Sequence, residues 1–151
     1  AVHRGTGTVY DLQADDELPA STARSFLYKI NPANGRATFV GFDSEYADGL
    51  AIDNAGRAFA TDFRISCSLF RVNLSDGRLS RIGSLGLNQE NCTGFDSGAG
   101  FHDSSGTLYA LREDGTIYTV NTSTGRATFK AVIKKGGVRV PGDLEGLDVR
   151  D

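Results

Sequence analysis

The segment Leu27-Tyr28-Lys29-Ile30-Asn31, followed by Gly35-Arg36-Ala37-Thr38-Phe39, decides the fold because the chain repeats it. The other two copies are Leu69-Phe70-Arg71-Val72-Asn73 with Gly77-Arg78-Leu79-Ser80-Arg81, and Ile117-Tyr118-Thr119-Val120-Asn121 with Gly125-Arg126-Ala127-Thr128-Phe129. The glycines that open the second half of each copy are 42 and 48 residues apart. Self-similarity at this period indicates a repeat architecture.

Each copy extends to four short segments, which we call A, B, C and D in chain order. Segments C and D are the two halves of the repeated motif, and each B segment follows a glycine, namely Gly7, Gly56 or Gly106. Segment A precedes B, as in Gly49–Asp53. All four are short and rich in β-branched and aromatic residues, which predicts strands. Turns that combine Asn or Asp with Gly join A to B and C to D, so each copy is expected to be an antiparallel meander.

A four-stranded meander of this length is typical of a β-propeller blade, and the hairpin turns argue against a β-solenoid. The repeats also resemble those of bacterial extracellular β-propellers of NHL-like type, with the pattern GLAxD…LYxIDPxTGxxTxIG. The resemblance covers nearly the whole chain and implies an all-β protein with three four-stranded blades. It implies no particular activity, because propellers host hydrolases, lyases, lectins and inert scaffolds.

The order of segments along the chain is B-C-D, A-B-C-D, A-B-C-D, A. We expect blade 1 over about residues 5–42, blade 2 over about 48–84 and blade 3 over about 98–133, all in one module that spans 1–151. The first blade is expected to lack its own A strand, and an unmatched A strand follows the third blade at about 144–151.

Three blades fall short of a ring, because propellers typically have about four to eight. We therefore expect the C-terminal strand of one copy, with Leu144, Gly146, Leu147 and Val149, to complete blade 1 of another copy. A six-bladed dimeric ring and a head-to-tail filament both satisfy this arrangement. A third arrangement is that the chain is one half of a longer gene product.

The composition limits the classes of partner. The chain has 16 basic and 19 acidic residues and no basic tract, so we expect no nucleic-acid partner. No apolar run reaches the roughly 20 residues of a membrane-spanning helix. The chain contains no methionine, so we expect that a leader or upstream segment has been removed, as in a mature secreted protein.

Cys67 and Cys92 are the two cysteines of the chain. In an exported protein an even pair usually forms a disulfide, and the alternative is two unrelated buried thiols. A meander places the A–B and C–D turns on one side and the B–C and D–A connections on the other. Both cysteines map to the side of the longer connections, which is where binding and catalysis usually take place. We therefore expect a Cys67–Cys92 disulfide.

Acidic residues near the starts of A segments predict a cation site at the propeller axis. Asp48 and Glu145 occupy matching positions, the third copy has Gly98 there, and Asp96 lies two residues earlier. Calcium prefers several oxygen ligands, so these acids are candidate calcium ligands. The competing interpretation is that they cap strands or pair with arginines, because acidic side chains are mostly solvated.

No catalytic constellation is evident in the sequence. The chain has two histidines, His3 and His102, and we align His102 with Ile52, inside a strand. No serine lies in a Gly-x-Ser-x-Gly elbow, and no glycine-rich loop has the strand–turn–helix setting of a phosphate site.

Three sequons are candidates for glycosylation. Asn73 and Asn121 share the turn position of Asn31, so turn chemistry already explains them. Asn91 is not a repeat residue and is therefore the stronger candidate.

We therefore expect a secreted, non-enzymatic structural or binding scaffold that assembles with itself through its C-terminal strand. Its ligand would be a glycan, a protein or a cation such as calcium. The alternative is a hydrolase or lactonase-like propeller enzyme with a divalent cation in the central channel.

Overall fold

The computed structural model describes residues 1–15, 22–88, 90, 92, 95–140, 144, 146, 147 and 149. The described residues form three four-stranded antiparallel sheets and one small hairpin. Blade 1 contains β1 (Val2–His3), β2 (Thr8–Ala14), β3 (Ser25–Ile30) and β4 (Ala37–Asp43). Blade 2 contains β5 (Gly49–Ile52), β6 (Ala58–Asp62), β7 (Ser68–Val72) and β8 (Leu79–Ser84). Blade 3 contains β9 (Ser97–Phe101), β10 (Leu108–Arg112), β11 (Thr116–Val120) and β12 (Ala127–Val132), and the hairpin contains β13 (Lys134–Lys135) and β14 (Val138–Arg139).

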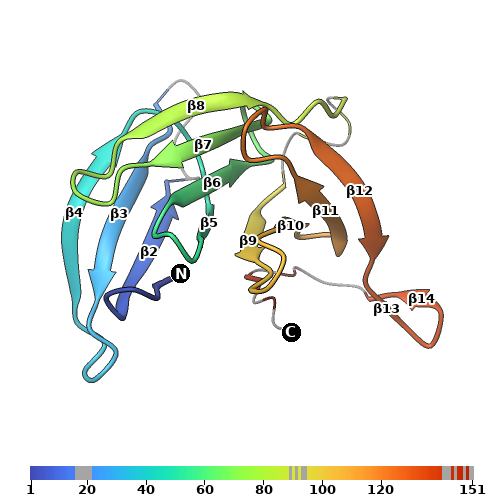
Figure 1. Cartoon of the computed structure of the whole chain (residues 1–151). Coiled ribbons are helices and arrows are strands. Elements are labelled where there is room, and N and C mark those ends of the chain that lie inside the picture. The colour runs from blue at the N-terminus through green and yellow to red at the C-terminus, as the bar shows by residue number, and fades with distance from the viewer. Residues whose placement is uncertain are drawn as a thin grey trace.

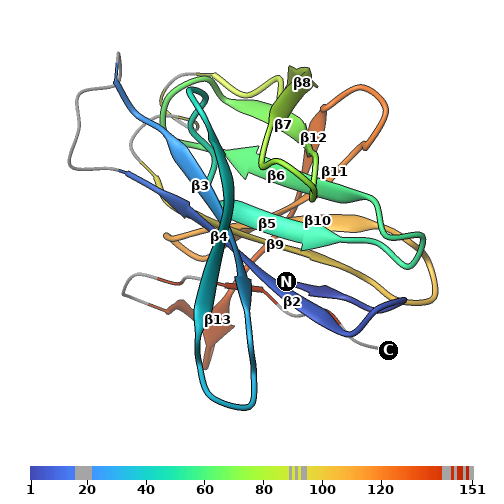
Figure 2. The same ribbon diagram turned by 90° about the vertical axis from the view of Figure 1, so that its left-hand side faces the viewer.

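The three blades stand side by side in an open arc (Figure 1). Strands β2, β5 and β9 lie on the inside of the arc, and β4, β8 and β12 lie on the outside. Figure 2, from the side, shows β5 and β9 running next to each other with β2 close by. The all-β architecture of four-stranded meanders that the repeats predict is therefore confirmed.

The three repeats share one irregularity. The pairing between the third and fourth strands shifts by one residue at Leu27/Tyr28 in blade 1, at Leu69/Phe70 in blade 2 and at Ile117/Tyr118 in blade 3. A bulge at one fixed place bends the outer strand of every blade in the same way. The repeated motif thus encodes a local distortion as well as four strands.

The core lies between the blades. At joint 1/2, the contact between blades 1 and 2, Tyr10 and Leu27 pack with Phe70 and Val72. At joint 2/3, between blades 2 and 3, residues in the corresponding positions form a second cluster: Phe59 and Leu69 with Tyr118 and Val120. Because successive side chains on a strand point to opposite faces, blade 2 contributes one face to each of the two joints.

Each joint is also closed at its outer rim by a turn that lies on a glycine. The turn after β7 packs on Gly41 of blade 1, where a Cβ added to Gly77 would lie 2.7 Å from the carbonyl carbon of Gly41. The turn after β11 packs on Gly83 of blade 2, where a Cβ added to Gly125 would lie 2.7 Å from the carbonyl oxygen of Gly83. Backbone packs on backbone at both places, so a side chain has no room there.

Blade 1 differs from the sequence expectation at its inner edge, because part of an A strand is present. In β1, Val2 pairs with Val9 and His3 with Thr8, and the amide of Tyr10 donates to the carbonyl of Ala1 at 2.7 Å. Two residues are too short for a hydrophobic pattern to reveal a strand. The sheet of blade 1 therefore runs from Val2 to Asp43. Its strand β1 covers about half of the inner edge of β2, which was expected to be empty.

The alignment of the third A segment was wrong by one residue. Phe101 pairs with Leu108 as Ile52 pairs with Ala58, so Phe101 is the counterpart of Ile52, and His102 lies one residue beyond β9. The cause is the turn: the amide of Gly106 donates to His102, four residues back, whereas that of Gly56 donates to Asp53, three residues back. By the same register, Ser97 and not Gly98 is the counterpart of Asp48.

We predict that Gly83→Ala destabilises the protein by about 1–3 kcal/mol, because a methyl group there overlaps the backbone of the turn before Gly125. The expected loss is about 2–9 °C in melting temperature, measured by circular dichroism. Ser80→Ala, an exposed position on the same strand, is the matched control and should change little. An unchanged melting temperature for Gly83→Ala would contradict the close approach.

Candidate functional site

A cavity of about 1120 Å³ lies on the inside of the arc, against the first strands of the blades. Its walls include β5 and β9, the C-terminal half of β2, and Gly146 and Leu147 from the C-terminal segment. Four carboxylates line it, namely Asp11, Asp48, Asp96 and Asp103, and Arg4 is the only basic residue among its described walls. Arg4 pairs with Asp103 at 2.6 Å, and the N-terminal ammonium of Ala1 also lines the cavity, so the lining carboxylates outnumber the positive groups that line it.

Asp48 is held in this cavity by hydrogen bonds from the next blade. It lies just before β5, and its carboxylate accepts two hydrogen bonds from Ser97 at the start of β9, from the amide at 2.9 Å and from the hydroxyl at 2.6 Å. The Ser97 hydroxyl also lies 3.0 Å from that of Thr61 on β6. These contacts link blade 2 to blade 3 at the inner end of their joint.

Burial of the carboxyl raises the pKa of Asp48 to about 7, although the hydrogen bonds from Ser97 oppose the shift. The nearby carboxylates of Asp96 and Asp62 raise the pKa further. The network accommodates both protonation states. A protonated Asp48 can donate to the Ser97 hydroxyl, which then donates to the Thr61 carbonyl oxygen at 3.4 Å. Asp48 is therefore a group that titrates near neutral pH inside the cavity.

Asp96 lines the same cavity, but its carboxylate has protein partners. It accepts hydrogen bonds from Arg64 at 3.0 Å and from the Tyr46 hydroxyl at 3.3 Å. The structure thus brings Asp48 and Asp96 to one cavity, whereas Glu145, the third candidate calcium ligand, lies outside the described residues. Within the described part of the chain, no three His, Cys, Asp or Glu side chains are grouped so that they could hold a metal ion.

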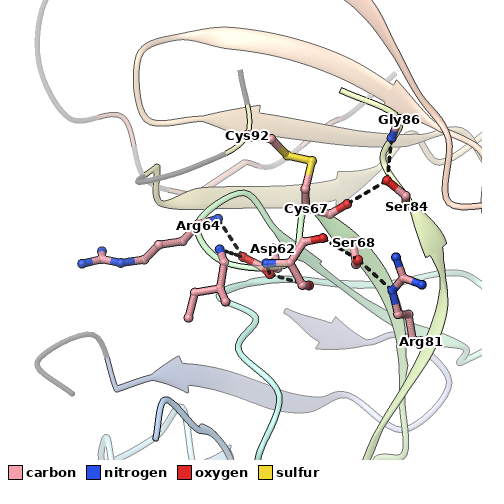
Figure 3. The surroundings of a disulfide bond; sticks show 10 residues. Asp62, Arg64, Cys67, Ser68, Arg81, Ser84, Gly86 and Cys92 are labelled. Carbon is pink, nitrogen blue, oxygen red and sulfur yellow. Dashed lines mark hydrogen bonds between the residues drawn. A yellow bond between two sulfur atoms is a disulfide. The ribbon is translucent and has the colours of Figure 1, made fainter. Parts of the chain in front are cut away.

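Cys67 and Cys92 form the expected disulfide, with their Cα atoms 5.5 Å apart (Figure 3). The loop before Cys67 is built on Asp62, whose buried carboxylate accepts hydrogen bonds from the amides of Arg64 and Ile65. The carbonyl of Cys67 in turn accepts the amide of Leu85 at 2.8 Å. The disulfide thereby ties the connection between blades 2 and 3 to the start of β7.

The turn interpretation of the repeated asparagines is supported. The side chains of Asn31, Asn73 and Asn121 each accept a backbone amide two residues ahead, at 2.9–3.0 Å. Asn91 lies outside the described residues. Neither histidine is among the residues that line the cavity, and the Nδ1 atom of His102 is 3.0 Å from the Ser105 hydroxyl in its own turn.

Sequence reasoning missed Ser97 and Thr61. A serine and a threonine carry no signal by themselves, and the one-residue error in aligning the third A segment hid the fact that Ser97 faces Asp48. Knowledge of the longer turn before Gly106 would have revealed it.

No protein-family model matches the chain, and no curated protein matches it either. Among solved structures, the chain is similar to a structural genomics protein of unknown function from Bacteroides thetaiotaomicron VPI-5482. The two share 14% sequence identity with a TM-score of 0.61 over 85% of this chain. The chain spans 31% of the length of that protein, so the likeness concerns the fold alone. Within the described residues, no helix has the length and apolarity needed to cross a membrane.

We predict that Asp48→Asn removes a pH-dependent loss of stability. In the wild type the folded pKa of about 7 exceeds the ordinary aspartate pKa of 3.8, so the folded state holds a proton that the unfolded state releases between about pH 4 and pH 7. Stability should therefore fall as pH rises through this window and stay level above it. Asn resembles the protonated carboxyl and should be more stable at pH 8 by about 2–4 kcal/mol.

Denaturant titrations of both proteins at pH 4, 6 and 8 test this prediction. The two curves of unfolding free energy against pH should converge at pH 4 and separate at pH 8. Asp76→Asn, at an exposed turn, serves as the control and should follow the wild type. Parallel curves for Asp48→Asn and the wild type would show that Asp48 does not titrate in this window.

We also predict that replacing both cysteines by serine costs about 3 kcal/mol, because the disulfide closes a loop with a sequence separation of 25 residues. Reduction of the wild type should reproduce the loss, whereas the reductant should leave the double variant unchanged. Equal melting temperatures for oxidised and reduced wild type would contradict a stabilising role.

Proposed function

We propose that this protein is a secreted, non-enzymatic scaffold that assembles with itself through its C-terminal strand. Its concave cavity would provide the binding surface. The proposal rests above all on one observation, the position of Gly146, Leu147 and Val149 at the inner edge of blade 3.

The C-terminal segment lies against β9 much as β9 lies against β5. A Cβ added to Gly98 would lie 2.8 Å from the backbone of Gly146, and one added to Gly100 would lie 2.7 Å from the carbonyl oxygen of Leu147. In the same way, a Cβ added to Gly49 would lie 3.3 Å from the backbone of Gly98. Gly146, Leu147 and Val149 thus lie where the inner strand of a fourth blade would lie.

Blade 1 offers a matching edge. On one side of β2, residues Val9–Ala14 all pair with β3. On the other side, β1 pairs only with the beginning of β2, at Thr8 and Val9. No strand of the described residues pairs with Asp11–Ala14 on the side of β1. Open sheet edges accept added strands readily. Residues 144–147 of a second copy would pair with this half of the edge, while β1 keeps the other half, so the donated strand is shorter than the sequence indicated.

A secreted location fits the disulfide, because such bonds persist in oxidising compartments. A binding role fits the acidic cavity, which would favour cationic groups of a glycan or protein ligand or a metal ion. The resemblance of the repeats to those of bacterial extracellular propellers supports the same compartment.

Deletion of residues 144–151 tests the assembly. We expect the wild type to sediment as a dimer or larger particle and the deletion variant to sediment as a folded monomer. Lys135→Ala in the β13–β14 hairpin keeps the C-terminal strand and should keep the wild-type mass. A deletion variant that folds and keeps the mass of the wild type would overturn strand donation.

A hydrolase or lactonase-like enzyme with a divalent cation is the second candidate, because Asp48 and Asp96 line one cavity and Asp48 titrates near neutral pH. Calorimetric titration with calcium chloride separates the two candidates. Micromolar binding that Asp48→Asn abolishes, together with hydrolysis of a lactone panel, would favour the enzyme. No heat of binding would favour the scaffold.

A further inference from the structure

We propose that the two end faces of the arc bind each other between copies, so that blade 3 of one copy packs against blade 1 of the next as blades do within the chain. This inference names the partner surfaces of the assembly proposed above and rests on it. The observation that carries it is independent of the C-terminal strand, because it comes from the burial of equivalent residues in the three repeats.

Each blade has a forward face, which bears Leu27, Leu69 or Ile117, and a rear face, which bears the following residue, Tyr28, Phe70 or Tyr118. At both joints, the forward face of one blade packs on the rear face of the next. The rear face of blade 1 and the forward face of blade 3 have no blade against them in the arc (Figure 1).

The rear face of blade 1 has the character of a joint surface. Phe70 and Tyr118 are 0% and 4% exposed in their joints, whereas their counterpart Tyr28 is partly exposed. The same contrast holds for Ile30 against Val72 and Val120, which are both buried. Phe26, beside Tyr28, is partly exposed and carries an aromatic ring where blades 2 and 3 have Ser68 and Thr116. Blade 1 thus presents an apolar face at the positions that the other two blades bury.

The forward face of blade 3 also has apolar side chains that are more exposed than their counterparts in the joints. Tyr109 and Ile117 are partly exposed, whereas their counterparts Phe59 and Leu69 are buried in joint 2/3. Leu111, which pairs with Ile117 on this face, is buried, so part of the forward face of blade 3 is covered within the chain. The rear face of blade 1 and the part of this face that bears Tyr109 and Ile117 are more exposed than their counterparts in the two joints. One contact satisfies both of them, and because it joins two different faces it is head-to-tail, which closes a ring or builds a filament.

One position distinguishes the joint between copies from the two joints within the chain. Gly41 and Gly83 leave room for the turn of the next blade, but the third repeat has Ala131 at the corresponding place. Its methyl group would hold the incoming turn, residues 33–35 of the second copy, away from β12. The joint between copies is therefore looser at its outer rim, and a single methyl group limits its strength.

Sedimentation equilibrium of the 151-residue chain and its variants tests this inference. Tyr28→Lys and Ile117→Lys should each weaken self-association about tenfold or more, because a lysine would be buried in an apolar contact. Phe129 is an exposed residue of β12, and its counterpart in blade 2 is Arg81. The control variant Phe129→Arg should therefore associate like the wild type. Ala131→Gly should tighten association severalfold. Thermal melting of each variant shows whether it is folded.

A mixture of Tyr28→Lys and Ile117→Lys is the decisive sample. Each variant alone damages both joints of a two-copy ring, whereas the mixed pair has one undamaged joint between blade 3 of the first variant and blade 1 of the second. We expect the mixture to form dimers at concentrations where neither variant does. No association in the mixture, or wild-type association by both single variants, would overturn the inference.

The deletion of residues 144–151 keeps the two proposals distinguishable. If the deletion variant stays associated while Tyr28→Lys dissociates, the faces bind and strand donation is wrong. If the deletion variant dissociates while Tyr28→Lys and Ile117→Lys stay associated, strand donation holds and the face contact is wrong.

Discussion

The packing of one blade on the next is the interaction on which the rest of this structure depends. A four-stranded sheet of some 40 residues buries too little surface to be stable alone, so its apolar faces require neighbours. The chain meets this requirement by stacking forward faces on rear faces and by removing side chains where backbones meet, at Gly41 and Gly83. The inner cavity exists because the first strands are held side by side by the same joints.

The sequence was sufficient to predict most of the strands and turns, but it did not predict the exact alignment of the inner strands. The repeated motif predicted the strands, the antiparallel order and the turns, because strand pattern and turn chemistry act over a few residues. It missed β1, since two residues carry no pattern, and it shifted the third inner strand by one position because the turn before Gly106 is one residue longer than its counterpart. Inner strands have no tight motif of their own, so their register becomes visible only through pairing.

The candidate site could be predicted in part. Sequence reasoning placed Asp48 and Asp96 near one axis, and they do line one cavity, because the starts of inner strands converge in a propeller-like arc. It did not anticipate that Ser97 and Thr61 would surround Asp48 or that Arg64 and Tyr46 would bind Asp96. Such contacts join residues up to 50 positions apart and depend on how two blades meet, which no local pattern encodes.

The disulfide gives the two joints of the arc different mechanical properties. Cys67 and Cys92 belong to the apolar cluster of joint 2/3, where Phe95 also lies under the guanidinium of Arg112, 4.1 Å from its ring centre. Joint 1/2 has no covalent link among its described residues and is held by apolar packing and by hydrogen bonds such as that from the Leu79 amide to Asp43. Under tension between its ends the arc would therefore open at joint 1/2 first, with blades 2 and 3 remaining together as a unit.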